Sequence, residues 1–362
     1  MRKNSEGKVW VKVIIVLLII VLILLGGAYG TFRYYYGLLN HADTKETKQK
    51  VETITEPEST TLSEEDMLHD LQSKATDIVY NENVFNILLI GADGRKGGTT
   101  GRSDAIMLLS INKETKKISL TSIMRDIYVS IPGHGSNRLN AAYSFGQEDL
   151  LKEVIQNYFG VSIDRFAQVN FYSFIDVIDA AGGVDIDVYQ KEIPMINAYV
   201  KTLSEERGTA LHLLDENFEG GTIHMDGTQA LAYTRVRYVG NGDFERTERQ
   251  RKVLTALKDT ASKMNVLELN SLLNKILPLI TTDLSEGECL SLLLNSGTYL
   301  SYDFESNRIP IEGTYKNARI DGRAVISIQF EPNRQALHDI IFNPVVEESS
   351  SAESSETKNS DN

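Results

Sequence analysis

Apolar residues recur along the chain with two different periods, and these periods predict a series of strands and helices. Short β-rich runs predict strands over 84–90, 105–111, 117–123, 128–131, 166–169 and 184–188. Spacings of three and four residues predict helices over 139–145, 148–158, 171–181, 227–235, 244–264, 266–280, 286–296 and 334–341. The first three strands are apolar enough for burial on both faces. The interleaved order favours an α/β fold, a three-layer α-β-α sandwich around a mixed β-sheet.

A longer apolar run precedes these elements. Residues 13–32 carry no charge over twenty positions, enough for one transmembrane helix across a hydrocarbon core of about 30 Å. Arg2, Lys3, Lys8 and Lys12 lie before the run, so the positive-inside rule predicts a cytoplasmic N-terminus and an extracytoplasmic remainder. A cleaved signal peptide is the alternative, but the run is longer than a typical signal-peptide core. We therefore expect a single-pass protein of the cell membrane.

Polar stretches set the expected domain boundaries. A basic N-terminus (1–12) and the membrane helix (13–32) precede an extracytoplasmic linker (33–78). One globular domain is expected over 79–342, because no linker-like composition interrupts it. The acidic, serine-rich residues 343–362 are expected to be disordered.

Composition excludes several classes of function. The 362 residues include 37 basic and 50 acidic ones, for a formal net charge of −13, which argues against nucleic-acid binding through a broad basic face. The single cysteine, Cys289, excludes an intramolecular disulfide and a multi-cysteine metal centre. The six histidines lack helical metal spacing, and the sequence has no Gly-x-Ser-x-Gly motif of a serine hydrolase.

Local charge departs from this acidic balance in one segment. Five arginines occur close together: Arg235, Arg237, Arg246, Arg249 and Arg251. The planar guanidinium binds phosphate oxygens in bidentate fashion, so convergent arginines favour a pyrophosphate ligand. The alternative is a solvated helical face with i to i+4 pairs, such as Glu245 with Arg249, and for a charge run alone it is the more common case.

Other segments add to the anion-site hypothesis. Asp93 follows the first predicted strand and Asp104 begins the second, on either side of a glycine-rich loop. Two carboxylates at strand boundaries suit a hard cation such as Mg²⁺ that also binds substrate phosphate oxygens, although an aspartate at a strand end is more often a turn residue. Arg102 lies two residues before Asp104, Arg125 follows the third strand, and Arg138 precedes a helix.

Six ordered motifs resemble the LytR-CpsA-Psr family of cell-envelope proteins. They are NILLIGADGR, GRSDAIMLLSIN, TSIMRDIYVSIPG, RLNAAYSFG, MDGTQALAYTRVR and GDFERTERQRKVL, within about residues 80–260. The resemblance implies a membrane-anchored phosphotransferase of cell wall assembly. Such an enzyme moves an anionic glycopolymer, such as wall teichoic acid or capsular polysaccharide, from a polyprenyl-pyrophosphate carrier to peptidoglycan. The family has also been described as transcriptional attenuators, but an acidic chain outside the membrane gives no support to DNA binding.

The resemblance also implies roles for individual residues. It assigns Mg²⁺, with Mn²⁺ as an alternative, to Asp93 and Asp104. The residues expected around the pyrophosphate are Arg102, Arg125, Arg138, Arg235, Arg237, Arg246 and Gln250. The expected catalytic residues are Asp104, Arg125, Arg237 and Asp243, with Asp104 or Asp243 as proton acceptor. Residues 192–221 look like an insertion. The apolar helices over 171–181 and 266–294 are candidates to line a slot for the lipid tail, although such stripes are usually core.

Two other functions fit the same residues. A pyrophosphatase or other hydrolase would use the same arginines and Mg²⁺ but would transfer to water. A noncatalytic polyprenyl-phosphate receptor would bind the lipid without chemistry. Formation of a covalent conjugate between polymer and peptidoglycan separates the transferase from both.

Overall fold

A mixed sheet of seven strands forms the centre of the computed structural model, which describes residues 26–42, 73–92, 101–236, 243–320 and 322–342. The strand order is β1-β10-β7-β2-β3-β4-β11. The bounds are β1 (Asn40–His41), β2 (Val84–Ala92), β3 (Ser103–Asn112), β4 (Lys117–Ile123), β7 (Arg165–Asn170), β10 (Thr281–Thr282) and β11 (Asp303–Ile309). β2, β3 and β4 are antiparallel, whereas β7 and β11 run parallel to β2 and β4. The mixed sheet agrees with the prediction.

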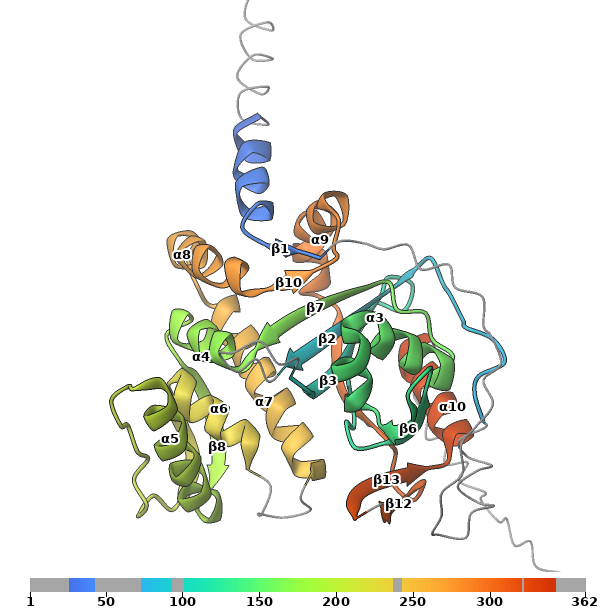
Figure 1. Cartoon of the computed structure of the whole chain (residues 1–362). Coiled ribbons are helices and arrows are strands. Elements are labelled where there is room, and N and C mark those ends of the chain that lie inside the picture. The colour runs from blue at the N-terminus through green and yellow to red at the C-terminus, as the bar shows by residue number, and fades with distance from the viewer. Residues whose placement is uncertain (1–25, 43–72, 93–100, 237–242, 321, 343–362) are drawn as a thin grey trace, which may run out of the picture.

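Helices cover both faces of this sheet (Figure 1). α3 (Asn140–Phe159) and α10 (Phe330–Phe342) pack on the face that presents Leu88 and Leu108, in one buried core. α7 (Asp243–Ser262) lies against the opposite face, where Arg251 Nε donates a 2.7 Å hydrogen bond to Ser306 Oγ and Lys258 lies 4.7 Å from the ring centroid of Phe304. These layers give the expected α/β class.

A second hydrophobic core lies beside the sandwich. It is formed by α4 (Phe171–Ala180), α5 (Ile193–Arg207), α6 (Gly227–Arg235) and the hairpin of β8 (Val184–Tyr189) with β9 (Gly220–Met225). A Cβ on Gly227 would lie 2.2 Å from the carbonyl oxygen of Ile175, so glycine permits the close approach of α6 to α4. α7 joins the two cores, because Phe244 is buried in the first and Val253 in the second.

The structure differs from the predicted elements in several places. α3 spans both predicted helices, and its non-helical residues Gly146 and Gln147 lie where the two were expected to meet. α8 (Val266–Ile276) ends before Pro278, because proline cannot continue a helix. Residues 192–221, which resembled an insertion in the sequence, include α5, whose buried residues Ile193, Ile196, Val200 and Leu203 belong to the second core. The pattern of the sequence also missed β6 (Gly135–Arg138), which pairs with β5 (Tyr128–Ile131), as well as β9, β11, β12 (Tyr315–Ile320) and β13 (Arg323–Ile328).

The beginning of the described chain is attached to the sheet. Residues 26–36 are helical, and β1 then pairs in parallel with β10, so residues 33–42 of the expected linker are folded. The predictions for 1–25, 43–72 and 343–362 lie outside the described residues. Among the helices that the structure describes, none has the length and apolar character needed to cross a membrane.

Candidate functional site

One edge of the central sheet collects the chain segments that carry the predicted site. Ala92, at the end of β2, pairs with Ser103 at the start of β3 and with Asn170 at the end of β7. β4 ends on the same side, because its Ser122 pairs with Met107 of β3. The carboxyl ends of strands are the usual location of ligand sites in open α/β sheets.

Asp104 occupies a β-bulge at this edge. Gly91 pairs with Ala105 and Ala92 pairs with Ser103, so Asp104 is the extra residue of β3 in this register. A bulge interrupts the ladder and redirects a side chain, and bulges are frequent next to active sites. A Cβ on Gly91 would lie 2.9 Å from the Cβ of Ala105, so glycine suits the close approach of the two strands beside the bulge.

A network of charges extends from Asp104. Its carboxylate forms an ion pair with Arg125, which follows β4. Arg125 Nε lies 3.6 Å from Asp126 Oδ2, and Arg138 Nη1 donates to Asp126 Oδ1 at 3.2 Å. The Arg125 side chain is 9% exposed and that of Asp104 is 21% exposed, so the network extends from the interior to the surface. Asp126 was not predicted as a site residue, although it directly follows Arg125 in the sequence.

α7 brings Arg246 and Gln250 to the junction of the two cores. Arg246 is buried and Gln250 is half-buried. Near the start of α7, the ring centroid of Phe244 lies 4.3 Å from the guanidinium carbon of Arg308, and Arg308 pairs in register with Ser122 of β4. α7 therefore begins next to the end of the strand that leads into the charge network.

Arg235 approaches the same edge from the second core. It ends α6, and its guanidinium carbon lies 5.5 Å from the ring centroid of Phe171 and 5.8 Å from that of Tyr199. Phe171 directly follows Asn170, the last residue of β7. The two aromatic rings hold the cation by cation–π attraction near the end of β7.

Arg249 is buried and is hydrogen-bonded to three groups of the protein itself. Its Nε donates to Glu192 Oε1 at 2.7 Å, its Nη2 to Glu245 Oε2 at 2.9 Å, and its Nη1 to the carbonyl oxygen of Val236 at 3.0 Å. The side chains of Arg249 and Glu192 are only 4% and 3% exposed. The Glu245–Arg249 pair expected for a solvated helical face is therefore present, but it belongs to a buried network. Arg249 joins Val236 to Glu245, which are separated in sequence by the segment that includes Arg237.

Two further polar groups near the site are enclosed by packing. Burial lowers the pKa of Arg251 to about 10, which leaves it charged at neutral pH. Burial raises the pKa of the Tyr143 hydroxyl, which donates to Gln168 Oε1 at 2.8 Å. Arg251 and Tyr143 therefore hold elements together around the site.

The predicted site residues thus fall into four groups. Asp104, Arg125 and Arg138 belong to one charge network, and Arg235, Arg246 and Gln250 lie on helices that approach the same edge. Arg102 is exposed at the start of β3. Asp93 and Arg237 lie outside the described residues, as does the side chain of Asp243. The described residues alone contain no group of three or more His, Cys, Asp or Glu that could hold a metal ion.

The two apolar helices proposed for a lipid slot have different environments. α4 buries Ile175, Val177 and Ile178, of which Ile175 and Ile178 belong to the second core, which is the usual role of such a stripe. α8 buries Leu272 and no other residue, and none of the residues of α9 (Glu286–Tyr299), all of which the structure describes, is buried.

Comparison with known proteins supports one family. The model of the LytR_cpsA_psr family matches residues 42–334. Regulatory protein MsrR of Staphylococcus aureus (strain COL) is 30% identical over 268 residues, which cover 73% of this chain and 76% of that protein. Polyisoprenyl-teichoic acid–peptidoglycan teichoic acid transferase TagU of Oceanobacillus iheyensis is 34% identical over 234 residues, which cover 62% of this chain and 67% of that protein.

Solved structures share the fold. The structure described as TagT bound to LI-WTA has a TM-score of 0.57 and 25% identity, and the match covers 74% of this chain and 96% of that one. A LytR-CPS2A-psr family protein, YwtF (TagT) with bound octaprenyl pyrophosphate lipid, has a TM-score of 0.54 and 24% identity at the same coverage. This second likeness concerns the fold alone.

Proposed function

Since the chain belongs to the LytR-CpsA-Psr family, we propose that it is a membrane-anchored extracytoplasmic phosphotransferase. It moves an anionic glycopolymer from a polyprenyl-pyrophosphate carrier to peptidoglycan. The observation that carries this proposal is the charge network of Asp104, Arg125, Asp126 and Arg138 at the edge where β2, β4 and β7 end. A relative named as a teichoic acid transferase supports the reaction class, and the uncharged run over 13–32 supports the anchor.

The arginines would bind the pyrophosphate. Arg125 and Arg138 present rigid forks of N–H donors, which suit phosphate oxygens better than a flexible ammonium does. Asp126 lies within 3.6 Å of one and 3.2 Å of the other, so it would hold both guanidinium groups in place before substrate arrives. Arg102, Arg235, Arg237, Arg246 and Gln250 would complete the site from the neighbouring elements.

Asp104 would hold Mg²⁺ or Mn²⁺ together with Asp93. The donor set fits a hard cation, because Asp104 offers a partly exposed carboxylate at the bulge and Asp93 directly follows Ala92. When bound, the ion would offset the negative charge of the two phosphates. The protein's own contribution is the positive charge of the arginines, directed to where charge grows on the departing lipid phosphate.

The transfer exchanges one phosphorus–oxygen bond for another. A sugar hydroxyl of peptidoglycan attacks the phosphorus next to the polymer, and the bond from that phosphorus to the bridging oxygen of the lipid phosphate breaks in line. Polyprenyl monophosphate leaves, and the hydroxyl proton passes to a carboxylate, for which Asp104 and Asp243 are the candidates. The product is a phosphodiester between polymer and peptidoglycan.

Product analysis with an arginine variant tests this function. The purified full chain, incubated with Mg²⁺, lipid-linked polymer and peptidoglycan, should yield a covalent conjugate. Arg125→Ala should lower the rate by on the order of a hundred-fold or more, as for the loss of an oxyanion donor. Arg125→Lys should recover little, because lysine keeps the charge but loses the fork.

Arg319→Ala, on the exposed surface of β12, is the matched control and should leave the rate unchanged. Circular dichroism of each variant separates lost chemistry from lost folding. Free phosphorylated polymer as the only product would show hydrolysis instead, and bound but unreacted lipid would show a receptor.

A further inference from the structure

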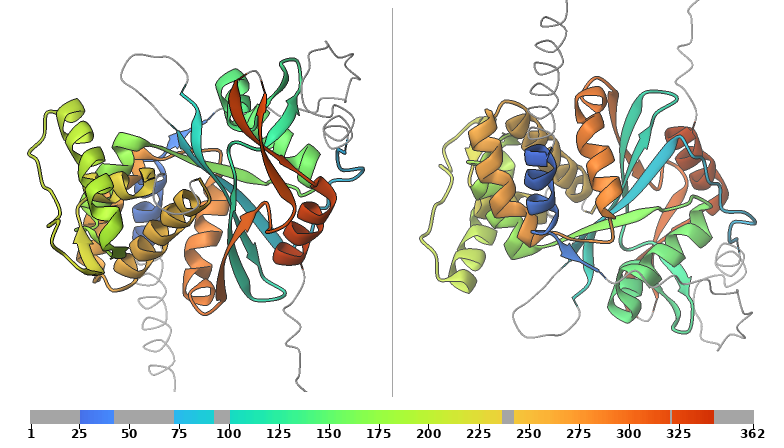
Figure 2. Two further views of the ribbon diagram at one scale, coloured as in Figure 1. Left: turned by 90° about the horizontal axis from the view of Figure 1, so that it is seen from below. Right: turned by 90° about the horizontal axis from the view of Figure 1, so that it is seen from above.

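Two helices on the side of the domain where the 26–36 helix enters are poorly covered by the part of the chain that the structure describes. In Figure 1, α8 and α9 lie on the same side of the sheet as the 26–36 helix, and the right-hand view of Figure 2 shows them on either side of it. At the start of α8, Val266 and Leu267 are 83% and 80% exposed. Leu293 and Leu294 of α9 are 55% and 75% exposed. Exposed neighbouring apolar side chains of this size are typical of an interaction surface.

Side-chain contacts fasten α8 and α9 to the 26–36 helix. Tyr34 donates to Asn274 Oδ1 of α8 at 2.9 Å, and Tyr35 hydrogen-bonds Asn270 of the same helix. On the other side, Tyr29 donates to Glu286 of α9 at 2.9 Å, and Arg33 forms an ion pair with the same carboxylate. The positions of the two helices relative to the 26–36 helix are therefore defined by contacts on both sides.

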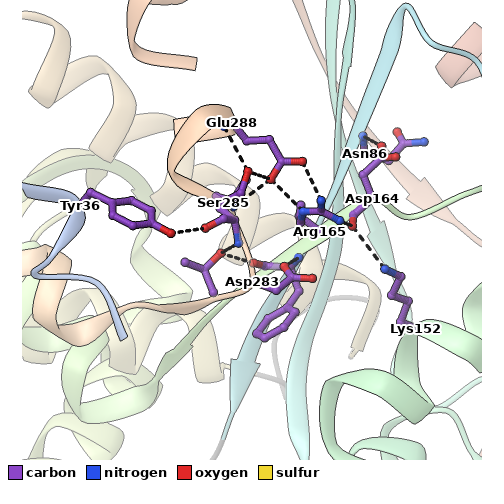
Figure 3. Close-up of polar contacts among 11 residues, drawn as sticks. Tyr36, Asn86, Lys152, Asp164, Arg165, Asp283, Ser285 and Glu288 are labelled. Atoms are coloured by element: carbon purple, nitrogen blue, oxygen red, sulfur yellow. Dashed lines mark hydrogen bonds and ion pairs between the residues drawn. The ribbon is translucent and has the colours of Figure 1, made fainter. Parts of the chain in front are cut away.

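The base of α9 is also fastened to the sheet (Figure 3). Arg165 of β7 binds Glu288 through two contacts of 2.9 Å, and Glu288 closes the N-terminal cap with Ser285. Tyr36 donates to the carbonyl oxygen of Leu284 at 3.4 Å. Because Arg165 holds the N-terminal end of α9 and Tyr36 contacts the residue just before it, α9 and the 26–36 helix are attached to the domain as one unit.

These helices and the segment before them carry residue types that are common at a membrane interface. The uncharged run 13–32 is followed by Arg33 and three consecutive tyrosines. Tyrosines are enriched where a membrane helix leaves the hydrocarbon core. In α9 and the turn after it, residues 289–302 contain no charged side chain. Tyr299 and Tyr302 pack against each other near its end, with ring centroids 5.4 Å apart. Hydrogen bonds to Tyr34 and Tyr35 bring α8 to the level of this tyrosine belt.

We propose that α8 and α9 dock on the outer surface of the same bilayer that residues 13–32 enter, with Val266, Leu267, Leu293 and Leu294 immersed in it. This inference rests on the membrane anchoring within the proposed function. Helices with apolar side chains on one side and a polar remainder bind in the plane of an interface. A second contact of this kind would fix the orientation of the domain, which a single flexible tether would leave free.

Site-specific labelling of the full chain in vesicles tests the docking. The single native thiol is removed by Cys289→Ser, and Leu294→Cys is then labelled with an environment-sensitive fluorophore. The chain is reconstituted at low density into phosphatidylcholine–phosphatidylglycerol vesicles with or without brominated lipid. The label should emit at shorter wavelength than in water and lose intensity with brominated lipid.

The matched control is Leu211→Cys, also more than half exposed and located between α5 and β9; α5 lies away from the 26–36 helix in Figure 1. Its label should emit as in water and keep its intensity. Equal behaviour of the two labels would overturn the proposal. A shift to shorter wavelength without quenching, seen only at high protein density, would replace the bilayer by a second copy of the chain. A shift to shorter wavelength without quenching, seen only after addition of polyprenyl pyrophosphate, would replace it by the substrate's tail.

Two readouts separate this proposal from the proposed function. Flotation of the vesicles reports whether the chain is anchored at all, and polymer transfer in the same vesicles reports chemistry. Quenching without transfer supports docking and contradicts the phosphotransferase. If the chain floats with the vesicles and transfers polymer but its Leu294 label is not quenched, the result supports the phosphotransferase and contradicts docking.

Discussion

Arginine side chains in this chain fall into two kinds of environment. Arg138 lies at a partly exposed position, where its side chain and that of its partner Asp126 are 20% and 16% exposed. Arg249 is enclosed by Glu192, Glu245 and the carbonyl oxygen of Val236. Removal of one partner of a buried pair costs about 3–5 kcal/mol, because the other charge stays buried. The same residue type therefore occurs in a partly exposed ion pair in one place and in a buried network in the other.

The two carboxylates that contact Arg249 provide a matched test of this distinction. Glu192→Ala should lower the free energy of unfolding by about 3–5 kcal/mol. Glu245→Ala, which removes the 35% exposed partner of the same guanidinium, should cost about 1 kcal/mol or less. Urea denaturation of both variants measures the difference. Equal losses would show that burial does not separate the two pairs.

At the scale of elements, the contact between α4 and α6 organises the second core. Asp226 caps α6, accepting a hydrogen bond from the backbone N–H of Gln229 at 2.9 Å, while Asp179 of α4 accepts one from the N–H of Gly227 at 2.7 Å. The start of α6 is thus fixed against α4. Arg235 ends the same helix, so its position at the candidate site depends on this contact.

A pair of glycine substitutions tests the close approach. Gly227→Ala should destabilise the chain by about 1–3 kcal/mol, because its Cβ would overlap the backbone of Ile175 and force α6 away. Gly287→Ala in α9 has no atom within 4 Å of the added Cβ and should be neutral or stabilising by up to about 1 kcal/mol. Thermal unfolding followed by circular dichroism checks both. A neutral Gly227→Ala would refute tight packing at this crossing.

At the scale of the whole molecule, a polar network connects the sheet to α3 and α9 (Figure 3). Asp164 Oδ2 accepts the backbone N–H of Asn86 at 2.8 Å, and the carbonyl oxygen of Asp164 accepts from Lys152 of α3 at 3.3 Å. Asp283 accepts the backbone N–H of Phe166 at 2.7 Å. Burial raises the pKa of both carboxyl groups, and hydrogen bonds and nearby cations offset part of that rise. Global stability should therefore carry a pH-dependent contribution from this network.

Asp283→Asn should reveal this contribution. The pKa of Asp283 is higher in the folded than in the unfolded chain, so the ionised carboxylate lowers the free energy of unfolding at pH values above the folded pKa. Acidification toward the ordinary aspartate pKa of about 3.9 protonates the carboxylate and removes this loss. The free energy of unfolding of Asp283→Asn, measured relative to wild type, should thus be higher at pH 7 than at pH 4. Its amide oxygen still accepts from Phe166, so Asp283→Ala is expected to be less stable than Asp283→Asn at both values. Urea unfolding at the two pH values measures these differences, and a pH-independent gap between Asp283→Asn and wild type would contradict the burial effect.

The local pattern of apolar residues was sufficient to predict the elements that are deeply buried. β2 and β3 contain apolar runs, β4 alternates apolar with polar residues, and all three form inner strands of the sheet, while Gly146 marks the bend of α3. β11 escaped prediction because its sequence DFESNRI is largely polar, which an edge strand tolerates. The ordered motifs were also enough to place the chain in its family, because they depend on residue identity and order alone.

Only the tertiary structure shows which residue each charged side chain pairs with. The arginine-rich segment reads as one basic cluster in the sequence, yet Arg249 is paired with Glu192, 57 residues away, and Arg125 with Asp104. Asp104 reads as a strand residue, and only the register of β2 against β3 makes it the bulged one. Periodicity records which side of an element is buried, whereas pairing depends on which segments meet, and that is set by packing between residues far apart in the chain.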